Sequence, residues 1–350
     1  MNIQKIIFSI LITFSISIGI YASSYIPNNH SEVKVKVKVE AEDIDITKEL
    51  YLIEEKANAE PIPPIPETLD LNIQKVLLGE KLFHDKNLSA DKTISCASCH
   101  DLSKGGTDHR PQSIGIYNRL GDINTPTVFN STFNFVQFWD GRADSLQEQA
   151  ISTLFGSHEM GNKDKEAILN YLNGSNEYRL LFKSLYPTPI SFNTFIDALT
   201  EFEKSLITPN SRFDKYLKGD NNALNTIELE GYQFFKTRGC ISCHQGINIG
   251  GNMYQKAGIF KKTSTQQNRN LDGRYTVTKN IDDKGLLKVP SLRNIALTPP
   301  YFHDGSTDTL EIAVDVMGKA QLGTELSEQE IHKIVAFLKT LTGEYKKQPL

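Results

Sequence analysis

The 350-residue sequence predicts a mainly helical fold of two similar domains with long loops. A short motif of two cysteines and a histidine occurs twice, and the two copies use all four cysteines of the chain. Apolar residues recur at helical spacing upstream of each copy. The segments that follow the two copies also match each other. We therefore expect one domain around each motif, at residues 67–207 and 208–350.

Each motif reads Cys-x-x-Cys-His, which is the signature of a covalently attached c-type haem. Two thiols on one turn can bond to the two vinyl groups of a haem, and the adjacent histidine supplies the proximal imidazole. A thioredoxin-like redox pair or half of a zinc site also uses Cys-x-x-Cys, but neither requires the histidine. We therefore expect two covalently bound haem c groups in two cytochrome-c-like domains. The residues are Cys96, Cys99 and His100 in the first copy, and Cys240, Cys243 and His244 in the second.

Three helices are predicted in most detail. The range 71–83 has apolar residues near helical spacing just before the first motif, and Ile227, Phe234 and Phe235 have the same place before the second. Ser327 and Glu330 form a capping box in front of an amphipathic C-terminal helix. The apolar residues of the first helix are Ile73, Val76, Leu77, Leu82 and Phe83.

The N-terminal region predicts export. Residues 1–22 contain Lys5 followed by an apolar run, as in a secretory signal peptide, so we expect a periplasmic protein. The run is near the short limit for a membrane span, so cleavage and retention as an anchor both remain open. Residues 23–66 are interpreted as a linker that ends in a stiff Pro-rich stretch. The Val/Lys alternation at 33–39 could form a strand, but with no evident partner we interpret it as a solvated spacer.

Composition excludes some other functions. The formal net charge is −4 and no basic cluster stands out, which argues against nucleic-acid binding. The glycine pairs at 105–106 and 250–251 are typical of turns or close backbone approaches rather than phosphate loops, because no Lys-Ser/Thr follows them.

An internal duplication follows the motifs. Residues 125–130 (TPTVFN) match 289–294 (VPSLRN), and 138–146 (FWDGRADSL) match 302–310 (FHDGSTDTL). In each copy a Pro-x-x-x-Asn segment leads to an aromatic-x-Asp-Gly turn. Past this turn the first copy reaches Glu159-Met160-Gly161, after seven extra residues, where the second reaches Val316-Met317-Gly318. We expect the two segments to bring different groups to the distal faces of the two haems.

These motifs resemble the bacterial di-haem cytochrome c peroxidases over about residues 67–345. The resemblance implies a peroxidatic N-terminal haem with His100 as proximal ligand. It also implies a high-potential C-terminal haem held by His244 and Met317, and methionine ligation does raise a haem potential. Alternatives are that Met317 only fills the core, or that Met253 is the ligand instead. Further segments of the resemblance are 78–83 (LGEKLF), 138–142 (FWDGR), 300–305 (PYFHDG) and 316–323 (VMGKAQLG).

The resemblance also implies roles around the first haem. By this resemblance Glu159 is the distal acid/base. One carboxylate can take a proton from one peroxide oxygen and give it to the other. Gln149 becomes a second polar pocket group, and Trp139, the only tryptophan, lies between the haems. The plainer alternatives are an ordinary surface glutamate at 159 and a buried aromatic anchor at 139.

A calcium ion between the domains is implied as well. Its ligands would be Asn124 and the carbonyls of Thr298 and Pro300, and oxygen ligands suit that ion.

The sequence departs from the family at one position. Counted from His100, the usual distal histidine of the first haem falls at Ile116, which cannot bind iron. Either this haem is open at rest or another group such as His109 takes the place, although we interpret His109 as a solvated loop residue. An open site is also similar to the MauG type of di-haem oxidase, which acts on a partner protein but has a tyrosine in place of Met317.

The expected function is therefore reduction of hydrogen peroxide to water, with electrons from a small cytochrome c or cupredoxin. The alternatives are a MauG-like oxidase of another protein and a non-catalytic di-haem electron carrier. A homodimer is expected from the resemblance alone.

Overall fold

The structure is a computed structural model that describes residues 60–261 and 272–350. The expected signal peptide and most of the expected linker, including the Val/Lys alternation at 33–39, lie outside the described residues. Within the described residues, no helix is both long and apolar enough to cross a bilayer. The fold is mainly helical with few strands, as predicted.

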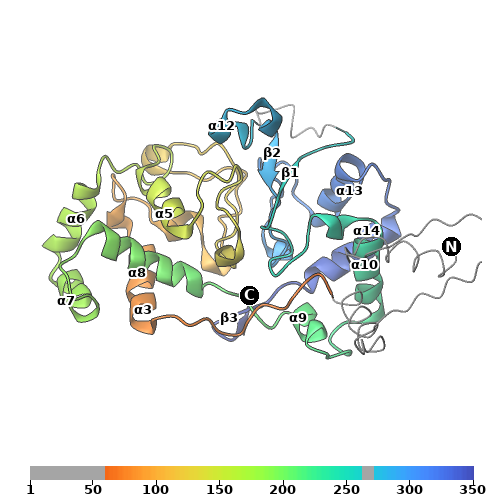
Figure 1. Cartoon of the computed structure of the whole chain (residues 1–350), viewed down its shortest axis with the longest axis horizontal. Helices are drawn as coiled ribbons and strands as arrows, with labels where there is room; N and C mark the ends of the chain where they lie inside the picture. The colour runs from red at the N-terminus through yellow and green to blue at the C-terminus, as the bar shows by residue number, and fades with distance from the viewer. Residues whose placement is uncertain (1–59, 262–271) are drawn as a thin grey trace, which may run out of the picture. The chain divides into compact units, whose positions relative to one another are not determined.

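The N-terminal half is built on helix α3 (Ile73–Phe83), which packs along α8 (Phe192–Ser205) (Figure 1). At Gly79 an added Cβ would meet the Ala198 carbonyl, so the two backbones approach closely there. The other helices of this half are α4 (Cys96–Cys99), α5 (Leu146–Phe155), α6 (Lys165–Gly174) and α7 (Asn176–Leu185).

Helix α3 confirms the helix predicted at 71–83, and only some of its apolar residues are buried. Asn72 caps the helix by accepting hydrogen bonds from the N–H groups of Gln74 and Lys75. Ile73 and Leu77 are 64% and 54% exposed, whereas Leu78 and Leu82 are buried. The apolar residues are spread over more of the helix surface than α8 covers. Contact with α8 therefore determines which of them are buried.

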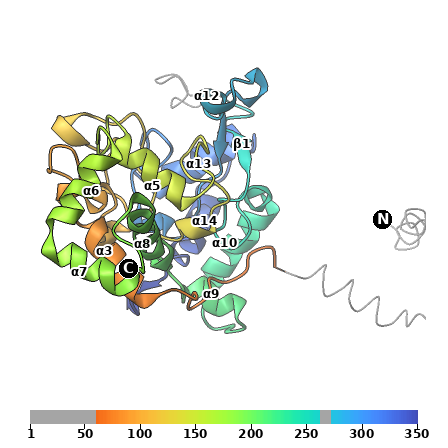
Figure 2. The same cartoon turned by 60° about the vertical axis from the view of Figure 1, so that its left-hand side comes forward.

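The C-terminal half is built on helices α10 (Thr226–Thr237) and α14 (Glu328–Lys339), which lie side by side in both views (Figures 1 and 2). Both predicted helices are confirmed, and so is the capping box. The Ser327 N–H donates to Glu330 Oε2 at 2.9 Å, and the Glu330 N–H donates to Ser327 Oγ at 3.3 Å. The other helices here are α9 (Arg212–Leu217), α12 (Tyr275–Thr278) and α13 (Leu310–Gln321).

Two short pairs of antiparallel strands complete the described fold. Strand β1 (Tyr254–Lys256) pairs with β2 (Leu286–Lys288). Strand β3 (Glu344–Tyr345) pairs with β4 (Gln348–Pro349) at the C-terminus. Tyr345 and Leu350 pack against the core of the N-terminal half, so the chain end returns to the first domain.

The Pro-rich stretch at 61–66 is part of the folded body. Ile62 and Ile65 are buried at 1% and 0% exposure. The Pro61 carbonyl accepts the Gly246 N–H at 2.9 Å, and the Ile65 N–H donates to Asp214 Oδ1 at 3.2 Å. This end of the expected linker is therefore attached to the C-terminal half rather than solvated.

The internal duplication is visible in the backbone. Asn130 and Asn294 both adopt the left-handed conformation, with φ of 61° and 60°. Phe138 and Phe302, one residue before Trp139 and His303, repeat this with φ of 66° and 69°. Non-glycine residues adopt this conformation only where surrounding contacts hold them. The matching pairs therefore confirm that the two segments are copies of one loop.

The two copies meet at Thr208. Its Oγ1 accepts hydrogen bonds from Asn130 Nδ2 at 2.7 Å and from Asn294 Nδ2 at 3.0 Å. The Thr208 N–H donates back to Asn130 Oδ1 at 2.9 Å. All three residues are essentially inaccessible to solvent. A buried amide that loses its partner is costly, so this hydroxyl fixes the two copies relative to each other.

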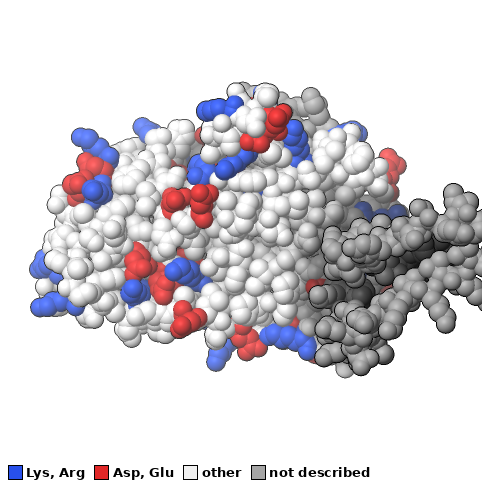
Figure 3. Space-filling model, viewed as in Figure 1, with Lys and Arg blue, Asp and Glu red and all other residues white. Residues whose placement is uncertain are grey.

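Acidic and basic side chains are interspersed on the face shown in Figure 3, with uncharged surface between them. This face has no extended region of one sign that would steer a charged partner over a long distance.

Replacing the Thr208 hydroxyl tests its role in joining the halves. Thr208→Val keeps the shape but leaves two buried amides without their acceptor. We expect a loss of roughly 1–3 kcal/mol in the free energy of unfolding for each amide left unpaired. Thr208→Ser keeps the hydroxyl and is the control. Thermal or urea unfolding of the two variants measures the difference, and equal stability would show that the shared hydroxyl does not join the halves.

Candidate functional site

The first Cys-x-x-Cys-His motif forms a single helical turn. The Ser95 N–H donates to Ser98 Oγ at 2.9 Å, which closes a cap around α4. His100 follows, and its Nδ1 lies 3.2 Å from the Gly106 carbonyl. An Nδ1–H directed at a carbonyl leaves Nε2 as the ligand atom, and this second partner orients the ring. Burial lowers the pKa of His100, which keeps the ring neutral for metal binding.

The second motif has the same arrangement. His244 Nδ1 lies 3.3 Å from the Ile249 carbonyl. Burial lowers the pKa of His244 to about 4. Both imidazoles are therefore held neutral in the tautomer that presents Nε2.

No disulfide joins any of the four cysteines. Burial raises the pKa of Cys240 to about 11, and burial with the nearby Asp108 raises that of Cys99 to about 11. These raised pKa values argue against the redox-pair alternative, because a reactive cysteine of that kind has a lowered pKa.

Glu203 on α8 tests whether the first site fits a haem. Its side chain is 5% exposed, and no described residue hydrogen-bonds to its Oε2. Burial raises its pKa to about 8, so the carboxyl is protonated at neutral pH and can donate a hydrogen bond. Glu203 is also close enough to Cys96 to help raise the pKa of that thiol. A buried donor without a partner beside the attachment cysteine fits a bound group with acceptor atoms.

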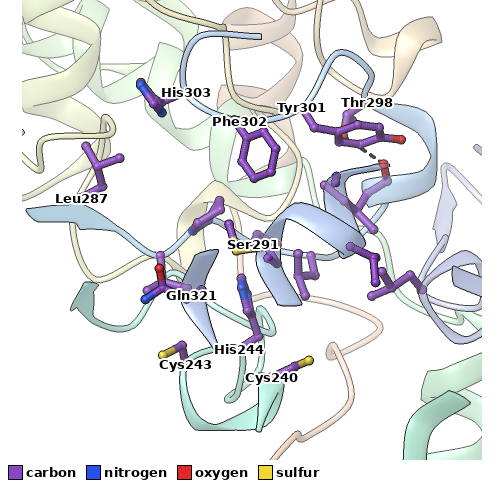
Figure 4. Close-up of a pocket in the computed structure, with 18 of the residues that line it drawn as sticks. Cys240, Cys243, His244, Leu287, Ser291, Thr298, Tyr301, Phe302, His303 and Gln321 are labelled. Atoms are coloured by element: carbon purple, nitrogen blue, oxygen red, sulfur yellow. Dashed lines mark hydrogen bonds between the residues drawn. The ribbon is translucent and has the colours of Figure 1, made fainter. Parts of the chain in front are cut away.

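The second site is a cavity with a mainly apolar lining (Figure 4). Cys240, Cys243 and His244 project into it from one loop, and Phe302 lies across from them. Met317 on α13 also lines the cavity, whereas Met253 is not among the lining residues. An apolar cavity lined by the His244 imidazole and the Met317 thioether fits a haem with His/Met ligation, and this favours Met317 over Met253.

Glu159 lies in the loop after α5, not on the helix. Its carboxyl is largely buried, and burial raises its pKa, opposed by the positive charges of Arg142 and His158. Glu159 is near enough to Cys99 to contribute to the raised pKa of that thiol. The structure therefore brings Glu159 and the first motif together. A largely buried carboxyl with a raised pKa holds a proton more readily than an exposed one, so it is suited to accept and return a proton.

Ile116 is fixed against the Glu159 loop. Its N–H donates to the Glu159 carbonyl at 3.0 Å, and the side chain is 2% exposed. An added Cβ at Gly161 would meet Ile116 Cδ1, so the isoleucine fills the space that this glycine leaves. His109 does not take the place of a ligand. It is exposed, and its Nε2 lies 2.8 Å from the Leu297 carbonyl in the other half.

Gln149 and Trp139 lie in different surroundings. Gln149 Nε2 donates to Thr153 Oγ1 at 3.0 Å, one turn along α5, and no hydrogen bond between described residues joins it to Glu159. Trp139 Nε1 donates to the Asn124 carbonyl at 3.0 Å, and its ring meets His303 edge-on at 6.2 Å between centroids. Trp139 therefore bridges the two halves and also lines the second cavity.

The three expected calcium ligands, Asn124, Thr298 and Pro300, all line the same cavity. The Asn124 N–H donates to the His303 carbonyl at 2.7 Å, which holds this loop against the C-terminal half. The described residues contain no cluster of three or more histidine, cysteine or acidic side chains that could hold a metal.

Two further residues escaped the sequence prediction. Glu203 lies on the apolar face of an amphipathic helix, where a charged residue is itself a signal. Lys288 is buried and lines the second cavity, and it directly precedes the VPSLRN segment as Asn124 precedes TPTVFN.

Comparison with known proteins gives a consistent result. Residues 73–222 match the family model described as di-haem cytochrome c peroxidase, and residues 229–342 match that of cytochrome c. The cytochrome c551 peroxidase of Nitrosomonas europaea is 48% identical over 81% of this chain and 85% of its own length.

A cytochrome c peroxidase of Escherichia coli (strain K12) is also 48% identical, over 82% of this chain, and the chain spans 62% of that relative's length. Among solved structures, a MauG-like protein associated with microbial copper homeostasis has a TM-score of 0.71 at 29% identity. The match covers 82% of this chain and 94% of that one.

Ile116 leads to a spectroscopic prediction. Because isoleucine cannot ligate iron and its segment is bonded to the Glu159 loop, we expect a high-spin haem in the fully oxidised protein, without prior reduction. Absorption and electron paramagnetic resonance spectra of the oxidised protein measure this. Ile116→His is the matched variant, and we expect it to convert the first haem to low spin. An entirely low-spin oxidised parent protein would contradict the open site.

Proposed function

This chain belongs to the di-haem cytochrome c peroxidase family, and on that premise we propose that it reduces hydrogen peroxide to water. The reaction consumes one peroxide, two electrons and two protons and yields two water molecules. We propose a small c-type cytochrome or cupredoxin as the electron donor and the periplasm as the location, with the N-terminal segment as the export signal.

The haems, when bound, supply the iron that binds peroxide and the redox centre that receives electrons. His100 and His244 would hold them through Nε2, since Nδ1 of each is directed at a backbone carbonyl. Met317 would be the second ligand at the His244 site.

One observation supports catalysis rather than simple electron carriage. It is the partly buried carboxyl of Glu159 with its raised pKa, close to Cys99 of the first motif. A carboxylate oxygen there can accept the proton of one peroxide oxygen and return it to the other as the O–O bond breaks. A carrier would need no such group.

Ile116 and the glycines around Glu159 shape the surroundings of this carboxyl. An added Cβ at Gly156 would meet Glu159 Oε2, so the glycine makes room for the carboxyl. Ile116 is buried beside the Glu159 loop and has no ligand atom, so we propose that it would leave room for a small substrate at the first haem.

Trp139 is proposed as the connection between the two centres. Its indole N–H is bonded to Asn124 of the first half, and its ring contacts His303 of the second. Gln149 is proposed as a polar residue that supports the distal loop, because its partner Thr153 accepts the Met160 N–H through its carbonyl at 3.2 Å.

We also propose a calcium ion held by Asn124 and the carbonyls of Thr298 and Pro300. All three are neutral oxygen donors that line one cavity, and such donors suit calcium. A homodimer is proposed from the family alone.

The role of Glu159 is tested by Glu159→Gln, which keeps the size but removes proton transfer. We expect both haems to be retained and peroxide turnover to fall roughly 10²- to 10⁴-fold. Because the base form must be present and burial raises its pKa, the parental rate should rise with pH through that raised pKa. The variant should lose this dependence. Stopped-flow mixing with peroxide at several pH values measures both effects.

The matched control for this variant is Glu166→Gln, an exposed glutamate in the first turn of α6. It should react at the parental rate. If Glu159→Gln also cleaved peroxide at the parental rate, Glu159 would have only a structural role.

Met317 is tested by its replacement with histidine. A thioether favours ferrous iron more than an imidazole does, so Met317→His should lower the potential of the second haem and slow electron entry. Peroxide binding at the first haem should be nearly unchanged. Redox titration measures the potential, and Met253→Leu is the control, which should leave it unaltered. An unaltered potential in Met317→His would remove Met317 as a ligand.

A further inference from the structure

Lys288 is a buried cation without a described counter-ion. It is 6% exposed, and its side chain forms no ion pair or hydrogen bond with a described residue. Burial lowers its pKa to about 8, which leaves it mostly charged at neutral pH. Burial of an ammonium group without a partner costs free energy. The burial of Lys288 therefore indicates that a bound anion pairs with it.

The surroundings of Lys288 show where that anion would be. Lys288 lines the same cavity as His244 and Met317, and no aspartate or glutamate is among the residues that line this cavity. Arg293 also lines it, but its guanidinium is already paired with the buried Asp214 at 2.7 Å. A group bound in this cavity must therefore carry the negative charge that pairs with Lys288.

The backbone holds Lys288 at the boundary between the two halves. Its N–H donates to the Trp139 carbonyl at 2.8 Å, and its strand β2 pairs with β1, where it lies opposite Tyr254. The lysine is thus fixed between the residue proposed to connect the two haems and the second cavity.

A haem c combines the features that this cavity requires, because it is a large apolar ring with two ionised propionates. We propose that Lys288 is the counter-ion of a propionate of the haem attached to Cys240 and Cys243. The inference rests on attachment of that haem and not on peroxide turnover, so it can fail while the proposed function holds.

The pairing has a consequence for electron transfer. A negative charge beside the ring stabilises ferric over ferrous iron, and a cation paired with it removes part of that effect. Lys288 would therefore help Met317 to keep the second haem at a high potential.

The experiment compares Lys288→Met, which removes the charge at similar length, with Lys288→Arg, which keeps it. Lys279→Met is the matched control, because Lys279 is exposed and is not among the residues that line the cavity. The holoprotein is prepared with haem carrying ¹³C-labelled propionates, and both covalent haems are counted first. Redox titration then gives the potential of each haem, and infrared difference spectra give the propionate carboxylate bands.

We expect Lys288→Met to lower the potential of the second haem only and to shift one carboxylate band. Lys288→Arg should stay near the parental potential, and Lys279→Met should change neither measurement. Unchanged bands and potentials in Lys288→Met would overturn the proposal, and so would a changed potential without a band shift. If Lys288→Met fails to incorporate the second haem, an unchanged carboxylate band in Lys288→Arg overturns it, because a guanidinium in place of the ammonium must alter a bound carboxylate.

Discussion

The hydroxyl of Thr208 joins the two copies of the duplicated loop, one from each half of the molecule. It accepts hydrogen bonds from two buried amides, Asn130 and Asn294, which occupy the same position in the two copies of the duplicated loop. Each asparagine is also held through its own Oδ1, by the N–H of Thr208 or of Gly343. Because all these groups are buried, the arrangement tolerates no shift without leaving a polar group unpaired. The relative position of the two aromatic turns, and so the contact of Trp139 with His303, follows from it.

A buried ion pair connects the Pro-rich stretch at 61–66 to the second half. Arg293 and Asp214 are 1% and 0% exposed in their side chains and are joined at 2.7 Å. Arg293 also donates to the Pro63 carbonyl at 3.1 Å, while Asp214 accepts the Ile65 N–H. Such pairs add little net stability after desolvation, but breaking one partner is costly. In this protein the Arg293–Asp214 pair holds the Pro-rich stretch in a single position on the second half.

The two copies of the internal duplication carry different chemical groups. Met317 lies within helix α13, whereas the matching helix α5 ends at Phe155 and Glu159 follows in a loop. Gly156 and Gly161 leave space for the Glu159 carboxyl and for Ile116, and the Ile116 N–H holds the loop through the Glu159 carbonyl. Seven extra residues follow the aromatic turn of the first copy, and Glu159 lies in a loop there, whereas residues 316–318 of the second copy lie in a helix. The two copies therefore carry different groups, a carboxyl at Glu159 and a thioether at Met317.

The sequence by itself determined the features that depend on local chemistry. The sequence was sufficient to predict the two haem motifs, the capping box of Ser327 and Glu330 and the helices before each motif, because each involves residues a few positions apart. It also showed the duplication, because two similar segments can be matched at any separation along the chain. Only the tertiary structure decided which apolar residues of α3 are covered, since α8 packs on Leu78 and Leu82 and leaves Ile73 and Leu77 exposed. It also decided that the Pro-rich stretch is folded and that Thr208, Glu203 and Lys288 are buried. Their partners and neighbours lie tens to hundreds of positions away, and the cost of burying a polar group depends on those neighbours rather than on the local sequence.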